Sequence, residues 1–136
     1  MIYLVDANIL SEPTKPNPHP RVVEWLKRHE RDLAVDPIIL GEIRFGILLL
    51  PPGARRRKLE KWLVLGIEKI RCLPFDAATG TRWAKLLADL RTARHAMPVK
   101  DSLIAATALT HNLTLATHNT PHFAHTGLNL TDPFAE

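Results

Sequence analysis

The sequence predicts an α/β fold in which helices cover both faces of a mostly parallel β-sheet. Two patterns indicate this fold. Short apolar runs of strand length alternate with longer segments whose apolar residues recur at helical spacing, and prolines stand between them. In such sheets, ligands bind beyond the carboxyl ends of the strands, where the strand order reverses. Residues that end a predicted strand are therefore the first candidates for a functional site.

The strands are predicted from short apolar runs that polar or turn residues interrupt. The first run ends at Asp6, and the later runs are equally short. Such runs are typical of strands that are buried on both faces. The predicted strands span residues 2–5, 33–35, 72–75, 113–116 and 128–130.

The helices are predicted from their apolar stripes and their boundary residues. Asp36 and Pro37 are typical of an N-cap and a first helical position. Four prolines between residues 13 and 20 predict an extended connector after Ser11 that resists helix formation. The predicted helices span residues 21–31, 37–50, 54–69, 77–95 and 99–111.

The composition is that of a small globular domain. The chain has 136 residues, 46% hydrophobic and 24% charged, so we expect one domain over residues 1–136. The one cysteine, Cys72, excludes an internal disulfide and favours a reducing compartment, and the first residues do not resemble a signal peptide. The longest apolar stretch, Ile47–Pro52, is too short to span a membrane. We therefore expect a soluble cytoplasmic protein, and its net charge of +4 weakly favours an anionic partner.

Several common chemistries lack their motifs. The six glycines form neither a dinucleotide-binding fingerprint nor a phosphate-binding loop, and no Gly-x-Ser-x-Gly sequence occurs. A single cysteine cannot build a cysteine-based zinc site. Nucleotide cofactors and serine acyl transfer are therefore disfavoured.

Three carboxylates are the strongest candidates for a functional site. Asp6 directly follows the first strand, Glu42 has apolar neighbours on its helix, and Asp101 stands in the first turn of a nearly all-apolar helix. Each has an ordinary structural interpretation. Asp6 can cap a helix, Glu42 can reach water or a distant arginine, and Asp101 can interact favourably with a helix dipole.

Together, these three carboxylates can converge at one edge of a parallel sheet. Because like charges repel, such a cluster needs a cation, and hard carboxylate oxygens suit Mg²⁺ or Mn²⁺. A metal held in this way can activate water and stabilise charge on a phosphodiester. The pattern therefore predicts metal-dependent hydrolysis of a nucleic-acid backbone, with Asp6, Glu42 and Asp101 as the catalytic residues.

Three blocks carry these residues: Val-Asp-Ala-Asn-Ile-Leu-Ser-Glu-Pro at 5–13, Gly-Glu-Ile-Arg-Phe-Gly at 41–46 and Asp-Ser-Leu-Ile-Ala-Ala-Thr-Ala at 101–108. They resemble the signature blocks of PIN-domain ribonucleases, and more narrowly those of VapC-type toxins of the FitB-like subgroup. The resemblance implies a three-layer α/β/α sandwich with a parallel sheet of about five strands. It also implies RNA cleavage with Mg²⁺ or Mn²⁺, a homodimer, and inhibition by a small VapB-like antitoxin.

The resemblance also assigns roles by position. It makes Asp6 and Asp101 the metal ligands, while Glu42 completes the cluster and orients or deprotonates the nucleophile. Residues of the first and last blocks are expected to support the site; these are Asn8, Thr117, Asn119 and His122.

Some residues depart from the family pattern. Ala7 stands where the family usually has threonine, His118 replaces an arginine, and His122 replaces a fourth carboxylate. Neutral imidazole suits softer ions better than Mg²⁺, so we hypothesise a second metal position that is weakened or shifted toward Mn²⁺. The departures keep open a PIN-like module that binds RNA or a partner but cleaves poorly. A receiver-like phosphoacceptor is disfavoured, because Asp6 has no acidic neighbour nearer than Glu12.

The histidines allow one further alternative. His118, His122 and His125 would share one face of a helix, as a zinc site requires, but Pro121 argues against a helix there.

A basic segment is a candidate for RNA binding. Five of the seven residues at 55–61 are basic, which by default indicates a solvated helix face. If this helix borders the acidic residues, its side chains would hold RNA through phosphate contacts, and binding would be salt-sensitive. The candidate RNA-binding residues are Arg55, Arg56, Arg57, Lys58 and Lys100.

Overall fold

The computed structural model describes residues 1–135, and within them five parallel strands form one sheet. The strand order is β3-β2-β1-β4-β5, so the first strand is central. The predicted fold class is confirmed, and each predicted strand overlaps an observed one. The strands are β1 (Tyr3–Val5), β2 (Leu33–Val35), β3 (Arg71–Cys72), β4 (Thr114–Ala116) and β5 (Leu130–Thr131).

Six α-helices connect the strands in the part of the chain that the structure describes. They are α1 (Ala7–Leu10), α2 (Pro20–Arg28), α3 (Pro37–Leu48), α4 (Ala54–Leu65), α5 (Ala77–Thr92) and α6 (Val99–Thr110). Short 3₁₀ turns occur at Glu12–Thr14, Glu30–Asp32, Ile67–Lys69 and Thr120–Phe123.

Several local expectations were wrong, and among them the predicted helix at 77–95 ends at Thr92. The one-turn helix α1 and the 3₁₀ turn at Glu12–Thr14 occupy a region for which no helix was predicted. The predicted helix at 21–31 ends at Arg28, before the turn at Glu30–Asp32. The predicted helix at 54–69 ends at Leu65. Its C-cap is Gly66, where a Cβ atom would lie 2.9 Å from a backbone carbonyl oxygen, and a 3₁₀ turn follows.

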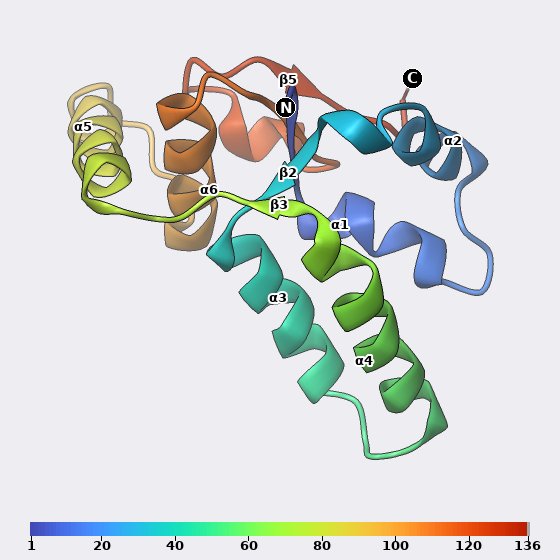
Figure 1. The fold of residues 1–136 in the computed structure, drawn as a ribbon. Coiled ribbons are helices and arrows are strands. Elements are labelled where there is room, and N and C mark those ends of the chain that lie inside the picture. The colour runs from blue at the N-terminus through green and yellow to red at the C-terminus, as the bar shows by residue number, and fades with distance from the viewer. Residues whose placement is uncertain (136) are drawn as a thin grey trace.

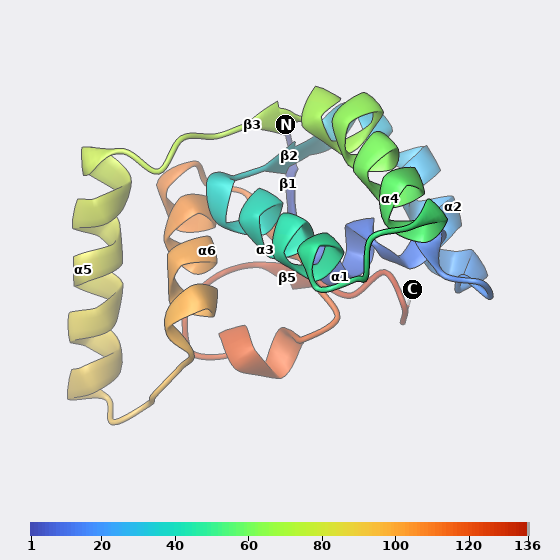
Figure 2. The same cartoon turned by 90° about the horizontal axis from the view of Figure 1, so that it is seen from below.

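Helices lie on both sides of the sheet. Figure 1 shows α5 and α6 side by side on one side and α2 on the other, and the view from below in Figure 2 shows the same separation. The antiparallel pair α3 and α4 projects away from the sheet as a hairpin (Figure 1). None of the helices within residues 1–135 is long and apolar enough to cross a membrane.

Burial explains why the central strands form. The side chains of β2 are all buried, and Leu4 and Val5 of β1 and Leu115 of β4 are fully inaccessible. Strands enclosed on both faces need continuous apolar sequence, as predicted. The edge strand β3 is instead exposed, which agrees with its short length.

The strand order reverses at β1, and this position creates the crevice in which ligands bind in open α/β sheets. From β1 the chain builds one half of the sheet with β2 and β3, and later returns to add β4 and β5 on the other side. The carboxyl ends of β1 and β4 are joined by a hydrogen bond from the Asp6 amide to the Ala116 carbonyl, at 2.9 Å. The first predicted site residue therefore lies at the switch point of the sheet.

Candidate active site

Asp6 is buried at the carboxyl end of β1 and caps α1. Its Oδ1 accepts a hydrogen bond from the Ala7 amide at 2.8 Å, and its Oδ2 accepts one from the Thr117 hydroxyl at 2.7 Å. The side chain of Asn8 also donates to Oδ2, at 3.4 Å. The helix-cap interpretation of Asp6 is therefore correct, but the carboxylate has further partners at the end of β4.

The predicted supporting residues hold Asp6 in place. The Asn119 amide donates to the Thr117 hydroxyl oxygen at 3.1 Å, and the His118 amide donates to the Asn8 side chain at 3.1 Å. Residues 117–119 are thereby hydrogen-bonded to residues 6–8. Ala7 cannot supply a hydroxyl, yet its backbone amide still binds Asp6.

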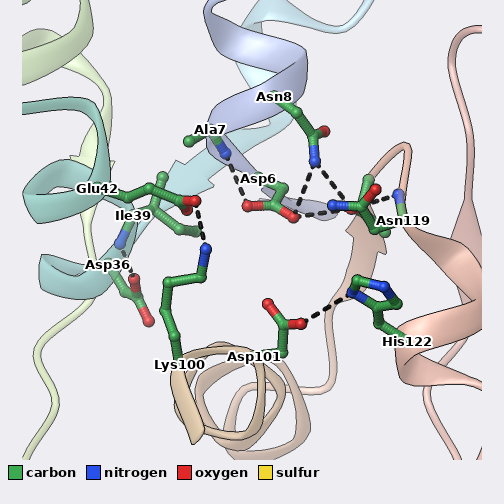
Figure 3. Close-up of polar contacts among 11 residues, drawn as sticks. Asp6, Ala7, Asn8, Asp36, Ile39, Glu42, Lys100, Asp101, Asn119 and His122 are labelled. Atoms are coloured by element: carbon green, nitrogen blue, oxygen red, sulfur yellow. Dashed lines mark hydrogen bonds and ion pairs between the residues drawn. The ribbon is translucent and has the colours of Figure 1, made fainter. Parts of the chain in front are cut away.

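The structure brings Glu42 and Asp101 to the same space as Asp6. Asp101 is buried in the first turn of α6, and Glu42 lies on α3 with its side chain 30% exposed. Burial raises the pKa of Asp6, and the negative charges of Glu42 and Asp101 raise it further, whereas the hydrogen bond from Thr117 lowers it. We call Asp6, Glu42 and Asp101 the acidic cluster; Figure 3 shows its members facing one another from three elements.

Glu42 differs from expectation in one respect. Its helix face was expected to be buried and to hold no local basic partner, but Phe45 is exposed. No ion pair forms within α3, as expected, and Glu42 Oε2 instead pairs with the distant Lys100 of α6. Its other oxygen, Oε1, is buried and has no hydrogen-bond partner among residues 1–135. The hydrogen bond to Glu42 raises the pKa of Lys100, so the lysine stays positively charged.

His122 lies beside Asp101 on the side opposite Glu42. Its Nδ1 is 3.1 Å from Asp101 Oδ2, so the imidazole is a hydrogen-bond partner of the predicted metal ligand (Figure 3). His118 instead contacts Asp132, with 3.1 Å between Nδ1 and Oδ2, and His125 stacks on His95 with ring centroids 3.6 Å apart. The three histidines thus have three separate partners, and the shared zinc site is ruled out.

The donor set of the acidic cluster fits a hard divalent cation. As the side chains are placed, no three acidic, histidine or cysteine groups of residues 1–135 are close enough together to enclose a metal ion. The buried, unpartnered Oε1 of Glu42 and the mutual repulsion felt by Asp6 are nevertheless features that a cation would relieve. Carboxylate oxygens are also the ligands that Mg²⁺ and Mn²⁺ prefer.

Two adjoining cavities lie between α4 and Glu42, the one member of the acidic cluster that lines either of them. One cavity of about 290 Å³ is lined by Asn8, Glu42 and Trp62, among others. A second, of about 460 Å³, shares Trp62 and is lined by Arg55 and Lys58. Part of the predicted basic segment therefore borders the path to the site.

The four candidate RNA-binding residues of this segment are not equivalent. Arg56 forms an ion pair with Glu60 at 3.1 Å and also donates to the Leu50 carbonyl oxygen. Arg55 and Lys58 line the second cavity, whereas Arg57 lines only a separate hollow along α4, which it shares with Lys58. Arg55 and Lys58 are therefore the better placed of the four to meet a ligand that enters the site.

The chain matches known proteins over nearly its whole length. The family model described as "PIN domain" matches residues 3–127. The chain is 36% identical to "Toxin FitB" of Neisseria gonorrhoeae, over 88% of this chain and 89% of that protein. It is 33% identical to "VapC ribonuclease Y4jK" of Sinorhizobium fredii, over 96% of each protein. The crystal structure of FitAcB from Neisseria gonorrhoeae superposes with a TM-score of 0.93 and 32% identity, covering 99% of this chain and 100% of that chain.

Proposed function

The chain belongs to the PIN-domain family, and from this premise we propose that it is a metal-dependent endoribonuclease, the toxin of a type II toxin–antitoxin pair. The relatives called a toxin and a VapC ribonuclease support this function. The observation that carries the proposal is the acidic cluster, in which carboxylates from β1, α3 and α6 surround one space at the switch point of the sheet. We further propose that residues 1–136 form one PIN domain and that it acts on RNA in the cytoplasm.

Asp6 and Asp101 would hold the metal, Mg²⁺ or Mn²⁺. When bound, the metal would supply an activated water and positive charge near the scissile phosphate. Thr117, Asn8 and the Ala7 amide fix the Asp6 carboxylate, so that its orientation is set before the metal arrives. His122 would fix Asp101 in the same way.

Glu42 would act on the attacking water. Its Oε1 is free of hydrogen bonds within the described chain and would accept the proton as the water oxygen bonds to phosphorus. The P–O bond to the leaving ribose would break in the same displacement, and the ribose oxygen would leave with the electron pair and take a proton from solvent. Lys100, which binds the other oxygen of Glu42, keeps this carboxylate turned toward the cluster.

RNA would approach along the two cavities beside α4. Arg55 and Lys58 line this path and would contact phosphates, which carry no sequence information. Arg56 is occupied by Glu60 and is a weaker candidate. Trp62, which lines both cavities, would offer an apolar wall to a base.

The α3–α4 hairpin would bind the VapB-like antitoxin. Phe45, Leu49 and Leu65 are each more than half exposed on this projecting hairpin, an unusual concentration of apolar surface. An apolar segment of the antitoxin that covers these residues would lie beside the cavities and obstruct the path to the acidic cluster. We also propose a homodimer, as the family resemblance implies.

Cleavage assays test the proposal. Single-stranded RNA is incubated with the protein in Mg²⁺, in Mn²⁺ and in EDTA, together with Asp101→Asn and the matched surface variant Asp89→Asn. We expect cleavage only with metal, none with Asp101→Asn and full activity with Asp89→Asn. Cleavage in EDTA, or an active Asp101→Asn variant, would contradict the proposal.

A further inference from the structure

Lys100 is the one residue of the predicted RNA-binding set that the structure places at the acidic cluster. It precedes Asp101 in the first turn of α6, and its ammonium group reaches across to Glu42 of α3. Figure 3 shows its side chain rising beside Asp101 toward the carboxylates of Glu42 and Asp6. The charges of Asp101 and Asp6 act on Lys100 as well as that of Glu42. Lys100 therefore carries the positive charge that faces all three carboxylates.

The carboxylate oxygens of the acidic cluster differ in whether they already have a hydrogen-bond partner. Oε2 of Glu42 is taken by Lys100, whereas Oε1 is buried without a hydrogen bond inside residues 1–135. The Asp6 oxygens are held by Ala7, Asn8 and Thr117. With Glu42 neutralised by the lysine, two carboxylates remain to balance a divalent ion.

We propose that Lys100 is an internal counter-ion that competes with the metal and holds Glu42 out of direct ligation. This role of Lys100 rests on the proposed function, since it concerns the same acidic cluster. In this arrangement Asp6 and Asp101 bind the metal, and Glu42 stays available for proton transfer. The lysine would lower metal affinity, because its charge would repel a divalent cation held by the same cluster.

The competing role is a phosphate contact, which the side chain of Lys100 could make because it is 50% exposed. The two roles differ in what removal of the charge does to metal binding. A phosphate-binding lysine strengthens RNA binding and leaves the affinity for metal alone unchanged. A counter-ion weakens metal binding even when no RNA is present.

Calorimetric titration of Mn²⁺ into the RNA-free protein separates these roles. We expect Lys100→Met to tighten Mn²⁺ binding about tenfold. In a Glu42→Gln background, where no carboxylate anchors the lysine, the same change tightens binding at most about threefold. The control is Lys85→Met, which removes a lysine from the exposed pair with Asp89 and leaves Mn²⁺ affinity unchanged.

Stability without metal gives a second readout. In EDTA, Lys100→Met lowers the melting temperature, because it leaves the half-buried Glu42 without its partner, whereas Lys85→Met has little effect. If Lys100→Met does not fold, Lys100→Gln, which keeps a polar side chain, is titrated instead.

Several results overturn the inference. Unchanged Mn²⁺ affinity in Lys100→Met, with weaker RNA binding, makes Lys100 a phosphate contact and leaves the proposed function intact. Equal tightening in both backgrounds shows that Lys100 does not act by holding Glu42. Absence of Mn²⁺ binding in the unmodified protein overturns the metal site itself, and with it both proposals.

Discussion

Two buried aspartates, Asp6 and Asp36, end the neighbouring strands β1 and β2, and each caps the helix that follows. Each also accepts a hydrogen bond from a threonine hydroxyl, Thr117 for Asp6 and Thr107 for Asp36, both at 2.7 Å. Burial raises the pKa of both carboxyl groups. Local structure alone does not distinguish them.

The difference lies in what the surrounding helices bring to each carboxylate. Asp6 faces the charges of Glu42 and Asp101, whereas Asp36 is surrounded by the amides of Ile38 and Ile39 and by Thr107. Both oxygens of Asp36 are used to join α3 and α6 to the sheet. A strand-end aspartate is thus structural when neutral donors satisfy it and a candidate for catalysis when it faces other charges.

The largest expected effect is on catalysis at Asp6. Asp6→Asn should lower the rate of RNA cleavage on the order of 10³-fold, because the proposed metal loses a charged ligand. The variant should keep its fold, since asparagine is also a good helix cap. Single-turnover cleavage, with circular dichroism to confirm folding, measures this. A rate within tenfold of the unmodified protein would remove Asp6 from the catalytic site.

At Asp36 the effect should fall on stability. Asp36→Ala should lower the free energy of unfolding by about 2–3 kcal/mol, because α3 loses its cap and Thr107 loses its buried partner. The rate of RNA cleavage per folded molecule should stay within about twofold of that of the unmodified protein. This is well below a tenfold change, which corresponds to about 1.4 kcal/mol in activation free energy. Urea denaturation and active-site titration together check this. If Asp36→Ala kept its stability and lost RNA cleavage, Asp36 would be the functional aspartate, which would contradict the distinction between the two aspartates.

The two threonines provide a matched pair. Thr117→Val should reduce cleavage about tenfold, since it removes a group that orients a metal ligand. Thr107→Val should instead cost about 1–2 kcal/mol of stability and leave cleavage unchanged. Equal effects of the two substitutions on cleavage would show that the hydroxyl groups do not serve separate roles.

Stability as a function of pH sharpens the comparison. Because the folded-state pKa of Asp6 is raised, the folded protein binds this proton more tightly than the unfolded chain does. The resulting stability is present below the unfolded pKa and is lost as the pH rises through the folded pKa. In EDTA, the stability of Asp6→Asn relative to the unmodified protein should therefore increase from pH 4 to pH 7. Denaturant titrations across this range measure the difference, and a constant difference would contradict the raised pKa.

The smallest effect is expected along the basic helix α4. Arg55→Ala and Lys58→Ala should each reduce the slope of log RNA affinity against log salt by about 0.7, the value for one lost phosphate contact on a single strand. Arg56→Ala is the control, because Arg56 is paired with Glu60. Fluorescence anisotropy with catalytically inactive Asp101→Asn gives the slopes. Slopes for Arg55→Ala and Lys58→Ala that are unchanged from the Asp101→Asn parent would exclude α4 from the RNA path.

Local sequence predicted the strand that Asp6 follows and the helix that carries Asp101, because strand ends and first helical turns have clear local signals. It could not predict which cation meets Glu42, because Lys100 lies 58 positions away and the contact depends on how α3 packs against α6. The hydrogen bond between Thr107 and Asp36 joins residues 71 positions apart and could not be predicted from local sequence either. The expectation of a buried face around Glu42 failed because α3 projects from the sheet in a hairpin, which leaves Phe45 exposed.

The central claim is that the carboxylate at the end of β1, and not its counterpart on β2, holds a divalent cation. The most direct test is calorimetric titration of Mn²⁺ into the unmodified protein, Asp6→Asn and Asp36→Asn. We expect a binding isotherm for the unmodified protein, none for Asp6→Asn, and an unchanged isotherm for Asp36→Asn. Equal Mn²⁺ affinity in the unmodified protein and Asp6→Asn would contradict the claim.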